Sequence, residues 1–147
     1  MDGENQKIIM MIETYDIKEE GYDPFLIREG WQVAQLNYSE DQHISNIGKI
    51  EVHRQTDEVF VLLKGKSILI TVDLINGEPT FKADIMKPHI TYNIPQNVWH
   101  NIAMEKGSEV LIVEKSNTHL NDVEYFHLTE KQIVELRVVA KKITEKI

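Results

Sequence analysis

Short runs of β-branched, aromatic and other apolar residues recur along the middle of the chain, and turn residues separate each run from the next. The runs cover residues 31–38, 49–53, 58–63, 67–74, 80–86, 91–94, 98–104 and 109–114. Apart from residues 54–57, the separators contain Gly or Asn, which adopt positive φ, or Pro, which lacks the N–H that a strand interior requires. Strands this short, joined by turns, are typical of an antiparallel sandwich or barrel and not of a parallel α/β sheet.

Two of these runs are apolar on both faces: residues 59–63 read VFVLL and residues 67–72 read SILITV. Because successive side chains of a strand point to opposite faces, both faces of these strands need a cover. We expect the barrel interior to cover one face. A second sheet, a helix or a partner subunit would then cover the other.

The hydrophobic period changes near the C-terminus, where Thr129 and Gln132 form a capping-box pattern that marks the start of a helix. Beyond it, apolar residues spaced by three or four positions form one helical stripe: Ile133, Leu136, Ala140, Ile143 and Ile147. Residues 130–147 carry a net charge of +2, which leaves −10 on residues 1–129. We expect this basic helix to pack on its own acidic domain or on a second copy of the chain.

The chain of 147 residues has the length of one domain. We divide it into an N-terminal extension with a strand (residues 1–30), a barrel core (31–115), a connecting segment (116–128) and an amphipathic helix (129–147). Within the extension, residues 8–12 are expected to form the short strand and residues 18–24 an acidic loop. The predicted fold class is therefore all-β, a small antiparallel barrel with one C-terminal α-helix.

Composition excludes several functions. The chain has no cysteine, so it has no disulfide, thiolate metal ligand or cysteine nucleophile. Its net charge of −8 disfavours nucleic acid as a partner, since binding requires basic residues to neutralise phosphates. No run approaches the roughly 18 apolar residues of a membrane span, and the first residues lack a secretory signal. We therefore expect a cytoplasmic protein without a membrane partner.

Histidines and carboxylates in three of the predicted strands indicate a metal site. Strand alternation places Glu51 and His53 on one face, Glu58 opens the next strand, and His100 lies in the strand that follows a Pro-containing turn. A buried carboxylate is costly unless a cation, a metal or hydrogen bonds accompany it. Neutral imidazoles and carboxylates together are the ligand set of Zn, Fe, Mn or Ni.

Two stretches resemble the motifs of the cupin superfamily, in particular its small single-domain RmlC-like members. The stretch EVHRQTDEVFVLLKG, residues 51–65, is similar to the first motif: Glu58, six residues and then Gly65 match it. The stretch IPQNVWHNIAM, residues 94–104, is similar to the second, with Pro95 and His100 in place and Asn97 where the family has Gly. Asn tolerates the left-handed conformation that such a turn requires. The resemblance implies the cupin jelly-roll barrel, a double-stranded β-helix.

The family's His-x-His pair is incomplete, and two registers are open. In the first, Glu51 replaces the first histidine and His53 is the second, so that the resemblance implies the ligands Glu51, His53, Glu58 and His100 for a divalent metal. In the second, His53 is the first and Gln55, a poor neutral ligand, replaces the other. We prefer the first register, because the second leaves one residue too few before Glu58.

Side chains near these motifs divide into pocket and packing roles. Phe60, Leu62, Ile102 and Met104 are candidates for lining the pocket, although all four also suit a plain core. His43, His89, His119 and His127 fall in polar segments and are expected at the surface. Trp99 should face away from His100 and serve in packing.

The resemblance implies a homodimer, a small-molecule ligand and one of three functions, with no catalytic residue assigned. The first is a metal-dependent enzyme of isomerase or dioxygenase type. The second is a non-catalytic binder of a small molecule, with or without metal. The third is a cupin with a degenerate site. Because one fold hosts many activities, the fold alone does not choose among them.

Overall fold

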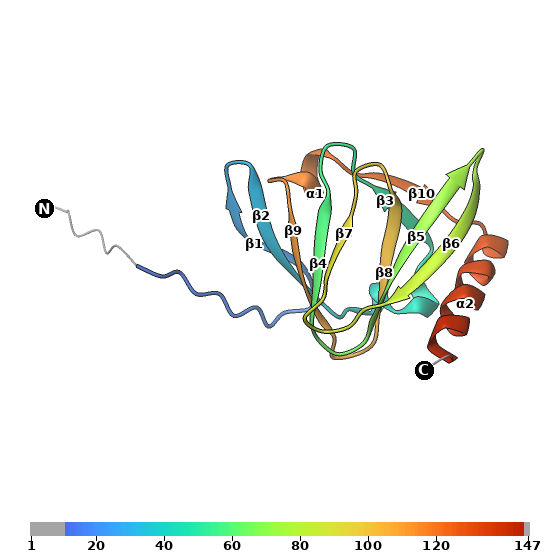
Figure 1. Ribbon diagram of the computed structural model, residues 1–147, viewed down its shortest axis with the longest axis horizontal. Helices are drawn as coiled ribbons and strands as arrows, with labels where there is room; N and C mark the ends of the chain where they lie inside the picture. The colour runs from blue at the N-terminus through green and yellow to red at the C-terminus, as the bar shows by residue number, and fades with distance from the viewer. Residues whose placement is uncertain (1–10, 146–147) are drawn as a thin grey trace, which may run out of the picture.

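Two five-stranded antiparallel sheets face each other in the computed structural model, which describes residues 11–145 (Figure 1). The strand orders are β1-β2-β9-β4-β7 and β10-β3-β8-β5-β6. The strands are β1 (Gly21–Arg28), β2 (Trp31–Asn37), β3 (Lys49–Val52), β4 (Glu58–Lys64), β5 (Ser67–Ile75), β6 (Glu78–Ile85), β7 (Thr91–Ile94), β8 (Trp99–Met104), β9 (Glu109–Glu114) and β10 (Glu124–His127). The helices are the short 3₁₀ turns η1 (Glu40–Gln42) and η2 (Ile44–Asn46), and the α-helices α1 (Thr118–Asn121) and α2 (Glu130–Glu145). This is the predicted all-β jelly-roll with a C-terminal helix.

Strands β2 to β9 lie where the sequence predicts them, and their observed ends differ from the predicted ones by at most two residues. The Gly and Asn residues of the turns adopt the positive φ expected of them: φ is 51° at Asn76, 77° at Gly77 and 68° at Asn97. The alternation of apolar residues and the turn residues were therefore sufficient to predict this part of the barrel.

The N-terminal extension contains a strand as predicted, but at a different place. Met11 and Ile12 form a bend and not a strand, and residues 8–10 lie outside the described part of the chain. Of the predicted acidic loop at residues 18–24, residues 18–20 are not in a strand, whereas residues 21–24 begin β1, which pairs with β2. Pairing overrides the low strand propensity of Asp23 and Pro24, which lie where the β1–β2 register shifts.

The predicted connecting segment, residues 116–128, also contains regular structure. Helix α1 lies at the upper rim of the barrel in Figure 1, and β10 pairs with β3 as an edge strand of the second sheet. Both elements are only four residues long, which is too short for a periodic pattern of hydrophobic residues to reveal them in the sequence.

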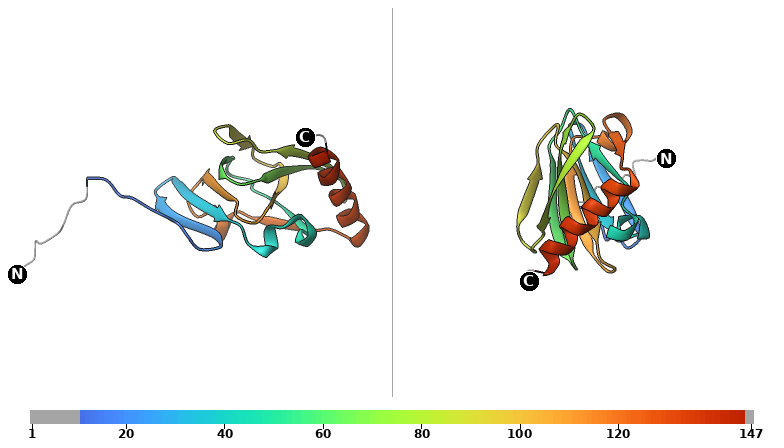
Figure 2. Two further views of the ribbon diagram at one scale, coloured as in Figure 1. Left: turned by 90° about the horizontal axis from the view of Figure 1, so that it is seen from below. Right: turned by 90° about the vertical axis from the view of Figure 1, so that its right-hand side faces the viewer.

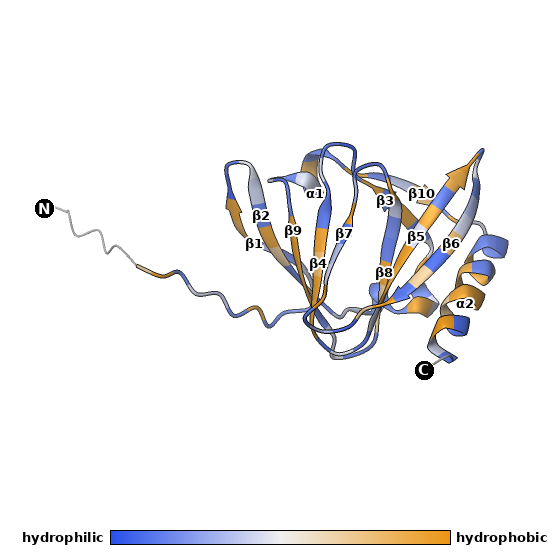
Figure 3. Cartoon of the chain, viewed as in Figure 1, coloured by the Kyte–Doolittle hydropathy of each residue, from blue (hydrophilic) through white to orange (hydrophobic). Residues whose placement is uncertain are grey.

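Two apolar cores explain why β5 is apolar on both faces. Leu69 belongs to the core between the two sheets, whereas its neighbour Ile70 packs with Leu136 of α2 on the outer face of the second sheet. Figure 3 shows hydrophobic residues in β5, and hydrophobic and hydrophilic residues alternating along α2. The helix thus covers the second apolar face, one of the covers that the sequence allows.

Helix α2 begins with the predicted capping box. The backbone N–H of Thr129 donates to Oε1 of Gln132 (3.0 Å), and the N–H of Gln132 donates to the Thr129 hydroxyl (3.2 Å). Gln132 also donates to the carbonyl of Gly77, and Arg137 to that of Ser45, so the basic helix packs on its own domain. Ile147 of the predicted stripe lies outside the described residues. Figure 2 shows α2 at one end of the molecule and residues before β1 leading away at the other.

Within residues 11–145, no helix has the length and apolar character needed to cross a membrane.

Candidate metal centre

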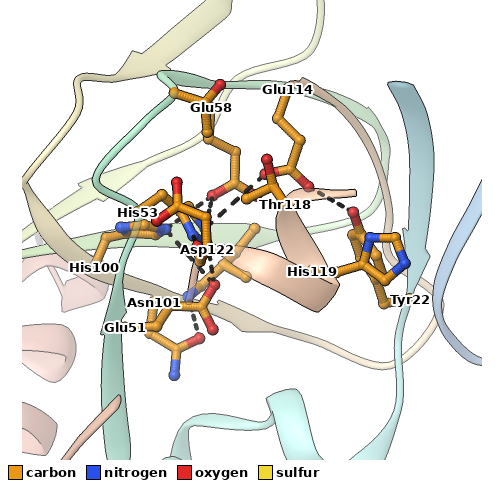
Figure 4. A network of polar contacts seen from close by, with 12 residues as sticks. Tyr22, Glu51, His53, Glu58, His100, Asn101, Glu114, Thr118, His119 and Asp122 are labelled. Carbon is orange, nitrogen blue, oxygen red and sulfur yellow. Dashed lines mark hydrogen bonds and ion pairs between the residues drawn. The ribbon is translucent and has the colours of Figure 1, made fainter. Parts of the chain in front are cut away.

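Four side chains from three strands and one loop meet at the upper end of the barrel (Figure 4). They are Glu51 of β3, His53 just after β3, Glu58 at the start of β4 and His100 of β8. One ligand atom from each lies within 4.8 Å of the corresponding atoms of the others. The structure thus brings together the four residues of the preferred register.

The pairing of the strands explains this convergence. Glu51 and His100 are direct partners in the β3–β8 pair, so their side chains share a face. Glu58 comes from the opposite sheet, and its Oε1 lies 3.0 Å from Nε2 of His53 and 2.9 Å from Nε2 of His100. Oε2 of Glu51 lies 3.3 Å from Nε2 of His53 and 3.9 Å from Nε2 of His100.

The backbone orients both imidazole rings. Nδ1 of His53 is 2.8 Å from the carbonyl oxygen of Asp122, and Nδ1 of His100 is 2.8 Å from that of Val98. A carbonyl oxygen only accepts hydrogen bonds, so each Nδ1 carries a proton and donates it. Nε2 of both rings is therefore directed at Glu58, the orientation that metal-binding histidines commonly take from their surroundings.

Asp122 also holds the loop that carries His53. Its two carboxylate oxygens accept the backbone N–H groups of Arg54 (2.9 Å) and Gln55 (2.8 Å). The N–H of Asn97 donates to the carbonyl of His53 (2.8 Å), which joins the second motif to the first. The loop is thus fixed from both sides.

Burial makes the charges of this group interdependent. His53, Glu58 and His100 are buried, whereas Glu51 is half-buried. Burial lowers the pKa of His53, but its hydrogen bonds to the carboxylates of Glu51 and Glu58 outweigh this effect and raise the pKa to about 11. Burial raises the pKa of Glu58, but hydrogen bonds from His100 and His53 outweigh this effect and lower it. Without metal, the group is therefore an imidazolium–carboxylate cluster.

The donor set suits a divalent metal ion. Two imidazole nitrogens and two carboxylates can bind Zn, Fe, Mn or Ni, and two negative charges balance a divalent ion. The closest donor atoms are 2.9–3.3 Å apart. Neighbouring ligands of an ion with bonds of about 2.1 Å are separated by roughly 3.0–3.5 Å. The other donor pairs lie within 4.8 Å, so these residues fit a metal once the more distant donors move closer together.

Gln55, the ligand of the other register, does not lie at the site. It is exposed, and its Oε1 accepts a hydrogen bond from Lys115 at 3.4 Å. Because Arg54 and Gln55 follow the end of β3 and are held by Asp122, the Gln55 side chain does not continue the strand face of His53.

A cavity of about 220 Å³ adjoins the four residues. Phe60 and Ile102 line it as predicted, but Leu62 and Met104 do not. They share the inner face of their strands with Phe60 and Ile102, yet lie farther from the site, where they pack within the core. Trp99 faces the other side, as predicted, and packs against Phe126.

The cavity also contains residues that the sequence analysis missed. His119, predicted at the surface, lines it together with Tyr22 and Glu114. The position of Glu114 could have been predicted from the sequence, because strand alternation places it on the same face as the buried Val110 and Ile112. Tyr22 and His119 lie in segments with no such pattern.

Glu114 is buried with its carboxylate beside the cluster. Tyr22 donates a hydrogen bond to its Oε2 at 2.6 Å, and its Oε1 lies 3.9 Å from Nε2 of His53. Burial, and secondarily the negative charge of Glu58, raises the pKa of Glu114 to about 7. Burial likewise raises the pKa of Tyr22.

Comparison with known proteins gives a likeness in structure and none in sequence. No protein-family model matches the chain, and no curated protein matches it. The protein BH2720 from Bacillus halodurans has a similar structure, with 14% identity, a TM-score of 0.54 and coverage of 80% of this chain and 84% of that one. At that identity, the likeness concerns the fold alone.

Two further structures have lower scores. A cupin-2 domain containing protein from Shewanella frigidimarina NCIMB 400 is 16% identical, with a TM-score of 0.46 and coverage of 67% of this chain and 84% of that one. The QdtA 3,4-ketoisomerase from Thermoanaerobacterium thermosaccharolyticum is 19% identical, with a TM-score of 0.47 and coverage of 73% of each chain.

Proposed function

We propose that this chain, which has the cupin jelly-roll fold, binds a divalent metal ion through Glu51, His53, Glu58 and His100 and a small molecule in the adjoining cavity. One observation carries the proposal: Nε2 of His53 and Nε2 of His100 are both directed at one oxygen of Glu58. Carbonyl groups hold the far side of both rings, so that the donor atoms are oriented before an ion arrives.

The metal would act as a Lewis acid toward an oxygen of the bound molecule. The chain itself orients and encloses that molecule. Phe60 and Ile102 form apolar walls that exclude water from the region of His100, and the ring of Phe60 lies edge-on to that of His100 with centroids 6.3 Å apart. A metal-dependent isomerase or dioxygenase is the class of enzyme that such a site would suit.

A metal-free binder of a small molecule is the second candidate. The pairing of Glu58 with both imidazoles already satisfies the charge of that buried carboxylate without an ion. In that case the cavity would bind its ligand through hydrogen bonds alone.

Metal analysis distinguishes the two candidates. Protein purified without a metal-affinity column should contain about one transition-metal ion per chain, or should take up one when Zn²⁺, Mn²⁺ or Fe²⁺ is added. Uptake should raise the melting temperature, since an ion that binds only the folded state stabilises it. His100→Ala should abolish uptake, whereas His127→Ala, which alters an exposed histidine of β10, should not. Absence of metal, together with an unchanged melting temperature, would exclude the metal-dependent function.

A further inference from the structure

One carboxylate oxygen in the cavity lacks a hydrogen-bond partner. The side chain of Glu114 is 3% exposed, and its Oε2 accepts hydrogen bonds from Tyr22 (2.6 Å) and Gln32 (3.3 Å). Its Oε1 is buried and has no hydrogen-bond partner among residues 11–145. A buried acceptor without a partner is costly, and it therefore indicates that a bound group completes it.

The surroundings of Glu114 fix the direction of this free oxygen. Gln32 approaches Nδ1 of His119 through its amide nitrogen (3.2 Å) and accepts the backbone N–H of Asn117 through its Oε1 (2.8 Å). Together with Tyr22, it joins β1, β2 and the start of α1 to Oε2 of Glu114 (Figure 4 shows the contact of Tyr22). Oε2 is thereby held, while Oε1 faces His53 across 3.9 Å.

The charge of the cavity restricts the ligand. Three carboxylates, of Glu51, Glu58 and Glu114, line it, and no lysine or arginine is among the described residues that do so. If a divalent ion is bound, two of these carboxylates balance its charge and the third remains in excess. A phosphate or carboxylate would meet no lysine or arginine of the cavity lining and would lie close to like charges.

We propose that the cavity binds a small, neutral molecule with two neighbouring oxygen functions, such as a vicinal diol or an α-hydroxycarbonyl compound. One oxygen would lie at the metal group, and the adjacent hydroxyl would donate a hydrogen bond to Oε1 of Glu114. Oε1 of Glu114 lies 3.9 Å from Nε2 of His53, a proposed metal ligand, so a small molecule bound at the metal group lies close to this oxygen. The volume of about 220 Å³ lies below the range of roughly 300–1,000 Å³ typical of larger ligands. This inference rests on the proposed metal-dependent function.

The affinities of the Zn²⁺-loaded protein for three matched probes, measured by NMR titration, test the proposal. Hydroxyacetone has the required hydroxyl donor, methoxyacetone carries a methoxy group in place of that hydroxyl and so cannot donate, and lactate adds a negative charge. We expect hydroxyacetone to bind about tenfold more tightly than methoxyacetone, the scale of one hydrogen bond to a charged acceptor. Lactate should bind more weakly than hydroxyacetone. Glu114→Gln should reduce the preference for hydroxyacetone over methoxyacetone to threefold or less.

The outcomes separate this inference from the proposed function. Equal binding of hydroxyacetone and methoxyacetone by a wild-type protein that has taken up Zn²⁺ would overturn the inference and leave the metal site intact. Tighter binding of lactate would also overturn it. Failure of the wild-type chain to take up any metal would overturn both. The wild-type preference is measured without a variant, so it decides the matter even if Glu114→Gln does not fold.

Discussion

Nε2 of His100 lies 2.9 Å from Oε1 of Glu58, although 42 residues separate the two in the sequence. His100 belongs to β8 of one sheet and Glu58 to β4 of the other. The contact therefore spans the interior of the barrel and forms only when both sheets are in place. The candidate metal centre is consequently a product of barrel closure, and metal binding should stabilise the folded chain.

The two registers of the first motif predict different effects of substitution. Glu51→Ala removes a carboxylate whose Oε2 is 3.3 Å from Nε2 of His53, and we expect the affinity for Zn²⁺ to fall at least tenfold. Gln55→Ala is the matched control, because that side chain is exposed and contacts Lys115. Competition with a chromophoric chelator measures both affinities. If Gln55→Ala weakened binding and Glu51→Ala did not, the preferred register would be wrong.

Asp122 is predicted to position His53. Asp122→Ala leaves the carbonyl that accepts the proton of Nδ1 but removes both carboxylate contacts to Arg54 and Gln55. The loop should then hold His53 less rigidly, and Zn²⁺ affinity should fall about tenfold with a smaller effect on melting temperature. Glu124→Ala is the control, since that carboxylate pairs only with the exposed guanidinium of Arg54. Equal Zn²⁺ affinity of Asp122→Ala and wild type would contradict the role.

Strand alternation made much of the site predictable. It placed Glu51 and His53 on one face and Trp99 opposite His100, and the structure agrees. The resemblance to the cupin motifs supplied the pairing of Glu58 with His100, because strand alternation does not say which distant strands meet. The same alternation also predicts that Glu114 faces the barrel interior, since it shares a strand face with Val110 and Ile112; the sequence prediction did not include it.

The remaining parts of the site depend on tertiary pairing. Tyr22 reaches the cavity because β1 pairs with β2, and Asp23 and Pro24 give that segment the composition of a loop. Asp122 and His119 belong to a segment that is placed by its contacts with β2, β3 and the loop after β3. Local propensity is weak in both segments, so the sequence alone could not place them.

The metal-free protein should be most stable at mildly acidic pH. The pKa of His53 is raised from 6.5 to about 11, so its stabilising charge is fully present below pH 6.5 and is lost as pH rises toward 11. The pKa of Glu58 is lowered from 4.5, so its contribution is present above pH 4.5 and is lost as pH falls below that value. Glu114, whose pKa is raised from 4.5 to about 7, contributes fully below pH 4.5 and loses its contribution as pH rises from 4.5 toward 7. Stability is therefore greatest near the acidic end of the range pH 4.5–6.5.

Thermal unfolding of metal-free protein at pH 5.5 and 8.5 tests this window. We expect the melting temperature to be lower at pH 8.5 by about 5 °C or more, the effect of one to two kcal/mol in a domain of this size. Excess Zn²⁺ should reverse the trend, because the metal competes with protons for Nε2 of His53 and His100. A melting temperature that is higher at pH 8.5 without metal would show that the cluster is not ionised as described.

We expect a second copy of the chain, the partner that the resemblance implies, to pair at β1. This strand is an edge of the first sheet; Ile27 near its end is 38% exposed, and Trp31 at the start of the neighbouring β2 is 45% exposed. We expect sedimentation equilibrium to give twice the mass of one 17.1 kDa chain. Trp31→Glu should shift the equilibrium toward the monomer, whereas Val134→Glu, on the exposed side of α2, should not. A monomeric wild-type protein at about 100 μM, a concentration well above the micromolar dissociation constants of specific complexes, would rule out this dimer.

Gly65, the glycine that ends the first cupin-like motif, should tolerate no side chain. Its φ is +90°, and a Cβ there would lie 2.5 Å from Cα of Ser108, which is backbone and unable to move aside. The hydroxyl of Ser108 accepts the N–H of Lys66 (2.8 Å) and donates to its carbonyl (2.7 Å), which fixes the close approach of the two turns. Gly77→Ala is the control, since φ is +77° and no atom lies within 4 Å of the added Cβ. We expect Gly77→Ala to cost about 1 kcal/mol of unfolding free energy and Gly65→Ala about 3 kcal/mol or more, measured by urea denaturation. Equal losses in the two variants would show that φ alone, and not contact with Ser108, requires glycine at position 65.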